Sequence, residues 1–301
     1  MAAEVLVALK PRPGGRYVDG TLGGAGHAAV LLAASSPTGW LFGCDRDGAA
    51  VEAARCRLMA TFAGRFEIRR GNFAELAAWV AAASCDGVLL DLGVSSPQLD
   101  SPQRGFSFQA DGPLDMRMDG RQSLTAADLV NGATAEELSG IFWELGGERE
   151  SRRLAKAIVH ERARQKIETT QQLATLIERV LSRPEKKAHP ATKTFQALRI
   201  AVNDEIGSLK RGLEAAMAVL KPGGRLAVIT FHSLEARVVK AFGNARTRGY
   251  TFVGQVDVPE LRQPRRPELK WVTRKAIVPG EAELKENPRS RSAQLRVLEK
   301  T

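Results

Sequence analysis

The sequence is poor in cysteine and has no long apolar run. Its three cysteines, Cys44, Cys56 and Cys85, have neither the spacing of a metal site nor that of a disulfide framework. No stretch reaches the roughly 20 apolar residues of a membrane-spanning helix, and no signal peptide opens the chain. These absences argue against a disulfide-rich secreted protein and against a membrane protein. They predict a cytoplasmic protein that has no membrane partner.

Acidic residues are fewer than basic ones. The 301 residues carry a net charge of +10, which suggests a polyanionic partner. The charge is uneven, because residues 151–200 and 201–301 each carry +8, whereas residues 1–103 carry −1 and residues 104–150 carry −5. A near-neutral half beside a basic half suits a small cofactor and a nucleic-acid substrate. The alternative is a basic protein whose charges only face solvent.

Glycines crowd one stretch, Tyr17–His27, around which the chain is organised. A short β-prone run ends in Asp19, glycines follow at 20, 23, 24 and 26, and an Ala-rich helix is predicted over 28–34. This succession lets the backbone approach a nucleotide-like ligand closely. Gly24–Ala29 fits the dinucleotide fingerprint, but the looser loop of S-adenosylmethionine (SAM) methyltransferases fits as well. An ordinary glycine-rich turn is the third interpretation.

Strands and helices alternate over the first ninety residues. Strands are predicted at 16–18, 40–44, 66–69 and 86–90, with helices between them at 28–34, 48–59 and 74–83. The alternation predicts a parallel sheet covered by helices, with ligands beyond the carboxyl ends of the strands. Polar or aromatic residues stand at all four strand ends, namely Asp19, Asp45, Asn72 with Phe73, and Asp91. We therefore expect a shared pocket there.

The alternation stops after Asp91. A Ser-, Pro- and Gly-rich loop is expected over 95–123, and a basic loop at 183–189. Helices are predicted near 124–131, 134–145, 149–166, 170–181 and from Thr192. These segments predict an inserted helical domain, 104–200, between two halves of one α/β domain, 1–103 and 201–301.

The last hundred residues return the chain to the sheet. A helix is predicted over 204–220, a strand over 221–231, and a further helix from Ser233 to about Phe242. Two final strands, near 270–276 and 292–298, have no crossover helix between them, so at least one runs antiparallel. That finish is typical of methyltransferase sheets and unusual in dinucleotide dehydrogenases.

Three motifs favour a methyltransferase. Asp45 is placed to accept hydrogen bonds from ribose hydroxyls, although enzymes that use NAD do the same. The turn Lys221–Gly224 precedes the fifth strand, as in many SAM methyltransferases. The segment Asp91–Gln98 echoes the acid-and-proline motif of enzymes that methylate amines.

Longer motifs make the chain resemble one family, that of ribosomal RNA small subunit methyltransferase H, also called RsmH and formerly MraW. They are DGTLGGAGH from Asp19, DGVLLDLGVSSPQLD from Asp86, RGFSF from Arg104, DGPLDMRMD from Asp111, HPATKTFQALRIAVNDE from His189, FHSLEARVVK from Phe231 and ENPRSRSAQLR from Glu286. The resemblance implies a class I SAM-dependent methyltransferase fold, a Rossmann-like α/β fold. Its mostly parallel seven-stranded sheet would end in an antiparallel C-terminal hairpin, and its inserted domain would be all-helical and recognise RNA.

The resemblance also implies the reaction, the cofactor and the site. SAM would methylate N4 of a cytidine in the decoding region of 16S rRNA, within the small ribosomal subunit or a late assembly intermediate, and a homodimer is a further expectation. No metal is needed. The cofactor contacts carried over from the family are Ala25, Gly26 and His27 for the methionine part, Asp45 for the ribose, Phe73 for the adenine, and Asp91 and Gln98 to close the pocket.

The proton acceptor stays open at this point. Acceptors for the amine hydrogens must lie beside the methyl group, so Ser95 and Ser96 are candidates, and Asp115 and Asp119 are carboxylate candidates. The alternatives are an amino methyltransferase for another RNA or DNA, a nicotinamide-dependent oxidoreductase, and a non-catalytic RNA-binding assembly factor. Basic and aromatic residues interleave over 246–275, which indicates RNA contact.

Overall fold

The structure is a computed structural model that describes residues 1–181, 189–252 and 258–301. Most of the predicted basic loop therefore lies outside the described residues, as does part of the predicted RNA-contacting stretch, 253–257. Among the described residues, no helix combines the length and the apolar character needed to cross a membrane.

The chain forms two compact units. Residues 1–93 and 206–301 make up the first, and residues 94–205 make up the second. The second unit extends beyond the predicted insertion, 104–200, at both ends. We refer to the two as the sheet unit and the helical unit.

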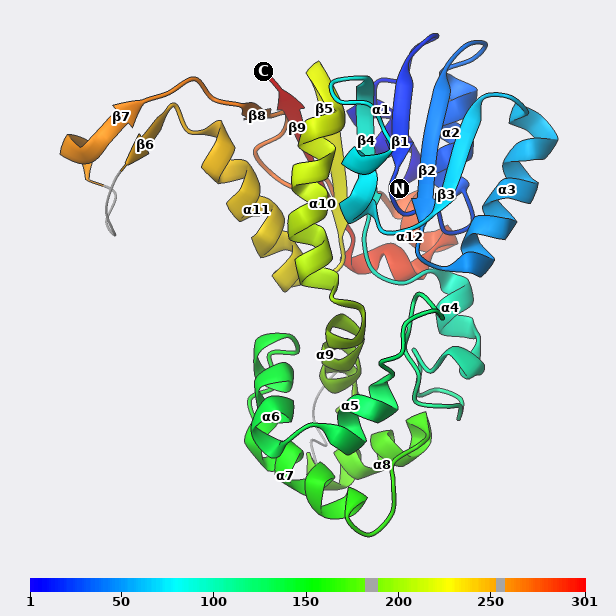
Figure 1. Ribbon diagram of the computed structural model, residues 1–301, viewed down its shortest axis with the longest axis vertical. Coiled ribbons are helices and arrows are strands. Elements are labelled where there is room, and N and C mark those ends of the chain that lie inside the picture. Colours follow the sequence, from blue (N-terminus) through cyan, green and yellow to red (C-terminus); the bar gives the residue numbers. More distant parts are fainter. Residues whose placement is uncertain (182–188, 253–257) are drawn as a thin grey trace. The chain divides into compact units, whose positions relative to one another are not determined.

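The sheet unit is built around seven strands (Figure 1). They are β1 (Arg16–Asp19), β2 (Trp40–Asp45), β3 (Phe66–Arg70), β4 (Cys85–Asp91), β5 (Leu220–Thr230), β8 (Leu269–Trp271) and β9 (Gln294–Lys300). In space the order is β3-β2-β1-β4-β5-β9-β8. The pairs among β1 to β5 are parallel, whereas β9 pairs antiparallel with both β5 and β8. The predicted mostly parallel sheet with an antiparallel C-terminal pair is thus confirmed. The strand order reverses between β1 and β4: β2 and β3 lie on one side of β1, and β4 and β5 lie on the other. Open α/β sheets bind ligands at such a point.

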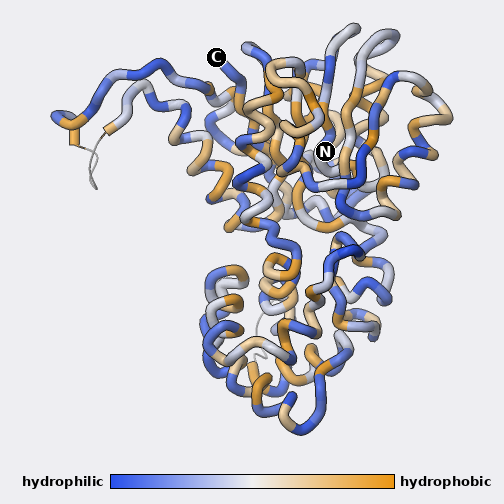
Figure 2. The backbone as a smooth tube through the Cα atoms, viewed as in Figure 1, coloured by the Kyte–Doolittle hydropathy of each residue, from blue (hydrophilic) through white to orange (hydrophobic). Residues whose placement is uncertain are grey.

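Helices cover both faces of this sheet. One face carries α1 (Ala2–Leu9), α2 (Gly26–Ala34) and α3 (Gly48–Phe62), and the other carries α10 (Glu205–Val219), α11 (Ser233–Thr247) and the 3₁₀ helix η1 (Phe73–Ala78). Side chains of a strand alternate between the faces. On β4, Val88 and Leu90 pack with α10, whereas Leu89 packs with the other layer, and all three are fully buried. In Figure 2, hydrophobic (orange) and hydrophilic (blue) stretches are interspersed through this unit.

Two parts of the sheet unit differ from the prediction. The predicted helix 74–83 is a short 3₁₀ helix instead, because the backbone amides of Ala83 and Ser84 bond to carbonyls at the end of α10. The segment before β8 contains an unpredicted hairpin of β6 (Tyr250–Phe252) and β7 (Arg262–Pro264). Strands of three residues are too short to leave a periodic pattern in the sequence. Short helices η3 (Pro259–Leu261), α12 (Glu281–Glu286) and η4 (Pro288–Ser292) complete the unit.

The helical unit contains α4 (Ser96–Asp100), η2 (Pro102–Arg104), α5 (Ala126–Gly132), α6 (Ala135–Glu144), α7 (Ser151–Arg162), α8 (Thr170–Val180) and α9 (Thr192–Asn203). Its own core includes Leu138, Phe142, Leu154 and Ile158, all without solvent exposure. Threonine capping boxes begin α5, α6 and α8, which explains why the sequence located these helices well. The stretch expected to be only a loop, 95–123, begins with α4 and η2.

Candidate cofactor and active site

The turn after β1 depends on Gly20. A Cβ atom at this position would lie 2.6 Å from Cδ2 of Leu90 and 2.9 Å from Cβ of Phe73, so no larger residue fits without displacement. The Gly20 amide donates to the Leu89 carbonyl at 2.9 Å. The loop is thereby fastened to β4 on its inner side.

The outer side of the loop is open. Gly23 and Ala25 adopt the left-handed conformation, with φ of 46° and 58°. A Cβ atom at Gly24 or at Gly26 would meet nothing within 4 Å. Helix α2 then begins at Gly26 and presents its first backbone amides beside this open space. The backbone here can therefore be approached closely by a ligand.

Asp45, at the end of β2, holds this loop and keeps acceptor capacity. Its carboxylate accepts hydrogen bonds from the amides of Gly23 at 2.8 Å and Asp47 at 2.9 Å. Burial is the main cause that raises the pKa of Asp45, and these backbone donors oppose it. A carboxylate has about four acceptor positions, so capacity remains for a ribose hydroxyl.

Asp19, at the end of β1, is the most deeply buried acid of the site, with 1% exposure. Its Oδ1 accepts from the Thr21 amide at 3.1 Å, but its Oδ2 has no partner among the described residues. Burial raises the pKa of Asp19 to about 6, against the opposing charge of His27 and the Thr21 hydrogen bond. A buried acceptor without a partner calls for a ligand donor.

His27 and Asp91 form a pair next to Asp19. Nε2 of His27 lies 3.4 Å from Oδ2 of Asp91. Nδ1 of His27 and Oδ1 of Asp91 are buried and have no hydrogen-bond partner among the described residues. Burial lowers the pKa of His27, but the hydrogen bond and charge of Asp91, together with the charge of Asp19, outweigh it and leave this pKa raised.

The structure therefore brings together the loop 25–27, Asp45 and Asp91 at the carboxyl ends of β1, β2 and β4. Three carboxylates, Asp19, Asp45 and Asp91, adjoin an open glycine loop and are faced by one histidine. Such a site favours a ligand that carries positive charge and hydrogen-bond donors. The methionine part and ribose of SAM have both, so the residues present fit this cofactor.

Phe73 lies at the same edge but is only 9% exposed. Its ring packs against Gly212 of α10, where a Cβ atom would come within 2.2 Å of the ring. Asn72 precedes it as the cap of η1 and donates to Oγ of Ser208 at 2.9 Å. The position of this aromatic ring is thus fixed by the core, which leaves little of its surface for contact with an adenine.

The remaining predicted residues belong to the helical unit. Ser95 and Gln98 form the capping box of α4, in which the Ser95 amide donates to Oε1 of Gln98 at 3.0 Å. Gln98 is 6% exposed, so its amide has a structural task in this unit. Ser96 is the first residue of α4 and its side chain is exposed.

Asp115 is engaged by Arg117 in a two-pronged ion pair, with Nε at 2.8 Å and Nη2 at 2.7 Å. Burial raises the pKa of Asp115, but the hydrogen bonds and charge of Arg117 outweigh it and lower the pKa overall. A carboxylate held in this way is a weak base. Asp119 makes a similar pair with Arg121, at 2.7 Å.

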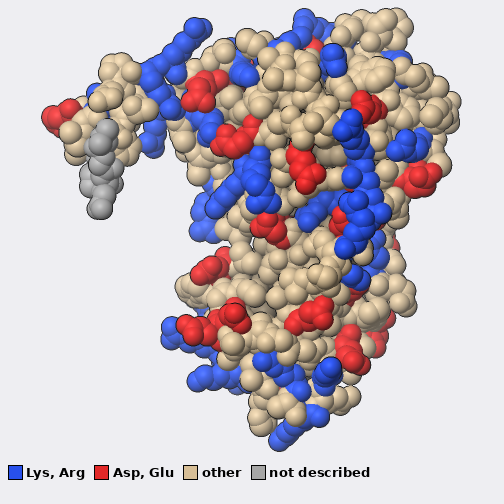
Figure 3. Space-filling view, in the orientation of Figure 1, with Lys and Arg blue, Asp and Glu red and all other residues tan. Residues whose placement is uncertain are grey.

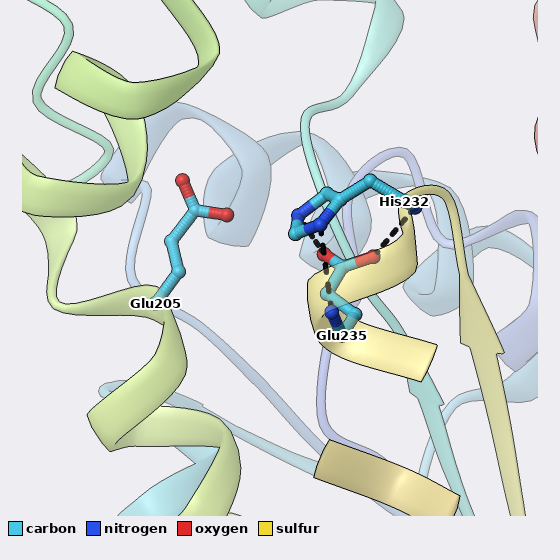
Figure 4. Close-up of side chains that lie close together, drawn as sticks. All are labelled: Glu205, His232 and Glu235. Carbon is cyan, nitrogen blue, oxygen red and sulfur yellow. Dashed lines mark hydrogen bonds and ion pairs between the residues drawn. The ribbon is translucent and has the colours of Figure 1, made fainter. Parts of the chain in front are cut away.

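The histidine after β5 has a capping role, which Figure 4 shows. His232 is the N-cap of α11, and Oε2 of Glu235 accepts from the amides of Phe231 at 2.7 Å and His232 at 3.2 Å. Nε2 of His232 lies 3.1 Å from Oε1 of Glu235, which is 2% exposed. The pair fixes the turn from β5 into α11.

Comparison with known proteins shows the family of the chain. The model of the MraW methylase family matches residues 1–301. The chain belongs to the MraW methylase family. Ribosomal RNA small subunit methyltransferase H of Geobacter sulfurreducens is 53% identical over 305 residues, which cover 100% of this chain and 97% of that protein. The protein of the same name from Heliobacterium modesticaldum is 46% identical over 303 residues, 99% of this chain and 96% of its own.

This membership confirms a class I methyltransferase with SAM as its cofactor and leaves the oxidoreductase alternative without support. Two residues of the candidate site were not assigned a role from the sequence, Asp19 and Thr21. The Thr21 hydroxyl accepts from the Asp91 amide at 2.7 Å and so ties the ends of β1 and β4 together. The strand-end position of Asp19 was a signal, but its unpartnered oxygen is visible only in the folded chain.

Proposed function

We propose that this methylase transfers the methyl group of SAM to N4 of a cytidine in the decoding region of 16S rRNA. The observation that carries the proposal is the carboxylate-lined glycine loop, in a chain that matches proteins named for small-subunit ribosomal RNA methylation over its whole length. An acid-rich pocket suits a cationic methyl donor, and a basic chain suits a polyanionic acceptor.

The proposed cofactor contacts use atoms described above. The open loop at Ala25 and Gly26, with His27, would hold the methionine part, where Oδ2 of Asp19 also lacks a partner. Asp45 would accept from the ribose hydroxyls. Bound SAM supplies an electrophilic methyl group on a sulfonium, and the protein must do the rest.

The protein's main task is to prepare the amine. The exocyclic nitrogen of cytosine shares its lone pair with the ring, so acceptors must bind the amine hydrogens and hold the nitrogen in line with the methyl group. Asp91 ends β4 with one oxygen that has no partner among the described residues. We propose Asp91 as an acceptor for the amine, ahead of Asp115, because Arg117 already occupies the latter. Ser95 and Ser96 remain hydroxyl candidates.

RNA contact is proposed for the segment 246–275. Some of its cations have structural partners among the described residues, and others do not. Arg246 joins α11 to α10 through an ion pair with Glu214 at 2.6 Å, and Arg265 ties the hairpin to carbonyls at the end of α11, so both have structural roles. Trp271 is likewise structural, because its indole donates to Asn244 at 3.2 Å. Arg266 is exposed and has no ion pair or hydrogen bond within the described residues, which makes it a candidate for phosphate contact.

The cellular setting is part of the proposal. A base paired in a helix must be unstacked before its amine can react, so we propose an open small subunit or a late assembly intermediate as substrate. The setting is then the cytoplasm. Recognition of the RNA is assigned to the inserted domain predicted over 104–200, together with the segment 246–275. A homodimer is the remaining partner hypothesis, which light scattering would test.

The deciding experiment uses labelled SAM and small subunits from cells that lack the protein. Nucleoside analysis should find label in N4-methylcytidine of 16S rRNA, at one position. Label in a ring carbon, a ribose hydroxyl or an adenine would contradict the acceptor assignment. Label in tRNA or DNA, with none in the subunits, would favour the alternative amino methyltransferase.

Arg266→Gln provides a test of the RNA segment. We expect weaker binding of small subunits and a shallower salt dependence, by about 0.7 to 0.9 in the log–log slope, because one phosphate contact is lost. SAM affinity should not change. Lys210→Gln, at an exposed cation of α10, is the matched control. Equal effects of the two substitutions would remove Arg266 from the interface.

A further inference from the structure

A groove of about 1020 Å³ lies along α6 and α7. All of its lining residues fall between positions 135 and 156, within the helical unit. None of the residues around the glycine loop takes part. The groove is therefore a feature of the helical unit alone, and nothing assigned so far to the cofactor site explains it.

Small residues form part of its lining. Ser139 and Ser151 approach so closely that their hydroxyls lie 3.1 Å apart. Gly140 is the next residue of α6, and a Cβ atom there would meet nothing within 4 Å. A larger side chain at this position would therefore enter the groove instead of the helix packing.

Trp143 stands at the groove with 58% of its surface exposed. It is one turn of α6 beyond Ser139 and Gly140. Its indole makes no hydrogen bond or ring contact within the part of the chain that the structure describes. An exposed flat ring beside an open groove is a stacking surface for another flat group.

Cations accompany this ring. Arg149, Arg152 and Lys156 line the groove and have no ion pair or side-chain hydrogen bond among the described residues. They lie three or four positions apart, which places them on neighbouring turns along one side of α7 and its N-terminal approach. Arg153 pairs with Glu150 at 3.0 Å, so the acids of the lining leave an excess of positive charge. Figure 3 shows Lys and Arg side chains interspersed with Asp and Glu side chains on this face of the helical unit.

We propose that this groove, the α6–α7 groove, binds an unpaired nucleotide of RNA. The base stacks on Trp143, and the flanking phosphates contact Arg149, Arg152 and Lys156. Aromatic rings interleaved with unpaired cations are the usual means of holding single-stranded RNA. The proposal rests on the proposed function in taking RNA as the ligand. The bound nucleotide is an anchor for the rRNA and is not the methyl acceptor, because no residue of the cofactor loop lines the groove.

The first test measures the dissociation constant of a short, unstructured oligoribonucleotide. The RNA carries a fluorescent label, and its anisotropy is followed as the full-length protein is added in the absence of SAM. Trp143→Ala should raise the dissociation constant roughly 5- to 150-fold, the range found when one stacking contact is removed. Trp143→Phe should restore most of the affinity. Met59→Ala removes another exposed apolar side chain, 54% exposed on α3, and should leave the affinity unchanged.

The second test separates charge from shape. Arg152→Gln combined with Lys156→Gln should lower the log–log salt slope by about 1.4, since single strands lose about 0.7 per phosphate contact. Lys166→Gln, at an exposed cation outside the groove, should not change the slope. Gly140→Leu should fill the groove and weaken RNA binding. Leucine has a higher helix propensity than glycine, so this substitution should not weaken α6 itself.

Two outcomes would overturn the proposal. One is an unchanged dissociation constant for Trp143→Ala in a variant that still binds SAM like the parent chain. The other is that Trp143→Ala binds naked RNA normally but no longer binds small subunits, which would assign the groove to a protein partner. Trp143-dependent RNA binding in a chain that methylates no cytidine would instead support the groove and refute the proposed function.

Discussion

Asp19→Asn should raise the free energy of unfolding of the cofactor-free protein and lower its affinity for SAM. Asp19 is 1% exposed, and only one of its oxygens has a partner among the described residues, the Thr21 amide. Asparagine keeps that acceptor and removes the buried charge. The substitution therefore isolates the cost of holding an ionised carboxylate at the end of β1.

The magnitude follows from the pKa of Asp19. Burial raises this pKa from 3.8 to about 6. Between pH 4 and 6 the folded protein holds a proton that the unfolded chain releases, so the free energy of unfolding falls as the pH rises through this window. Above it the penalty is constant at about 3 kcal/mol, since one pKa unit corresponds to about 1.4 kcal/mol.

Thermal and urea unfolding of both proteins at pH 4 and pH 8 measure this effect. Asp19→Asn should be more stable than the parent by up to about 3 kcal/mol at pH 8, and the difference should shrink toward zero near pH 4. Calorimetry should show weaker SAM binding, because a negative charge beside a cationic ligand is lost. A stability difference that is absent, or equal at both pH values, would refute the reasoning.

Four further predictions concern single positions. Asp45→Ala should weaken SAM binding in calorimetry by roughly 1.5–3 kcal/mol, the worth of a charge-assisted hydrogen bond, and unchanged affinity would exclude Asp45 from the site. Gly20→Ala should lower the free energy of unfolding by about 1–3 kcal/mol, because its Cβ would lie 2.6 Å from a leucine of β4. Gly24→Ala faces open space and should keep the parent's melting temperature while SAM affinity falls; a lower melting temperature would contradict the open geometry. Asp115→Asn should destabilise the chain through loss of the Arg117 pair and leave SAM affinity intact, whereas a lost methylation rate without lost stability would make Asp115 a proton acceptor.

The local elements were largely predictable because their signals are local. Asp47 caps α3, and three threonine boxes begin helices of the insertion, so their N-termini could be located to within a residue or two. Where tertiary contacts outweigh local preference, the prediction fails. The helix expected over 74–83 gives way to η1 because the following amides bond to α10.

The clustering of the candidate site residues was predictable, but their detailed geometry was not. Acids at the ends of parallel strands must meet at one edge of the sheet, which placed Asp19, Asp45 and Asp91 together. Nothing local indicates that His27 pairs with Asp91, or that Arg117 occupies Asp115. Such pairings depend on side-chain directions that are set only when distant segments pack.

The sequence by itself determined the class of this protein: a parallel α/β sheet interrupted by helices, an acid-rich glycine loop, and family motifs along nearly the whole chain. These follow from periodicity, capping residues and motif spacing, which are properties of neighbours in the chain. Tertiary structure alone decided the strand order, the unpartnered oxygens of Asp19 and Asp91, and the groove beside Trp143. Those features arise from contacts between residues far apart in sequence, or from the space that packed helices leave open.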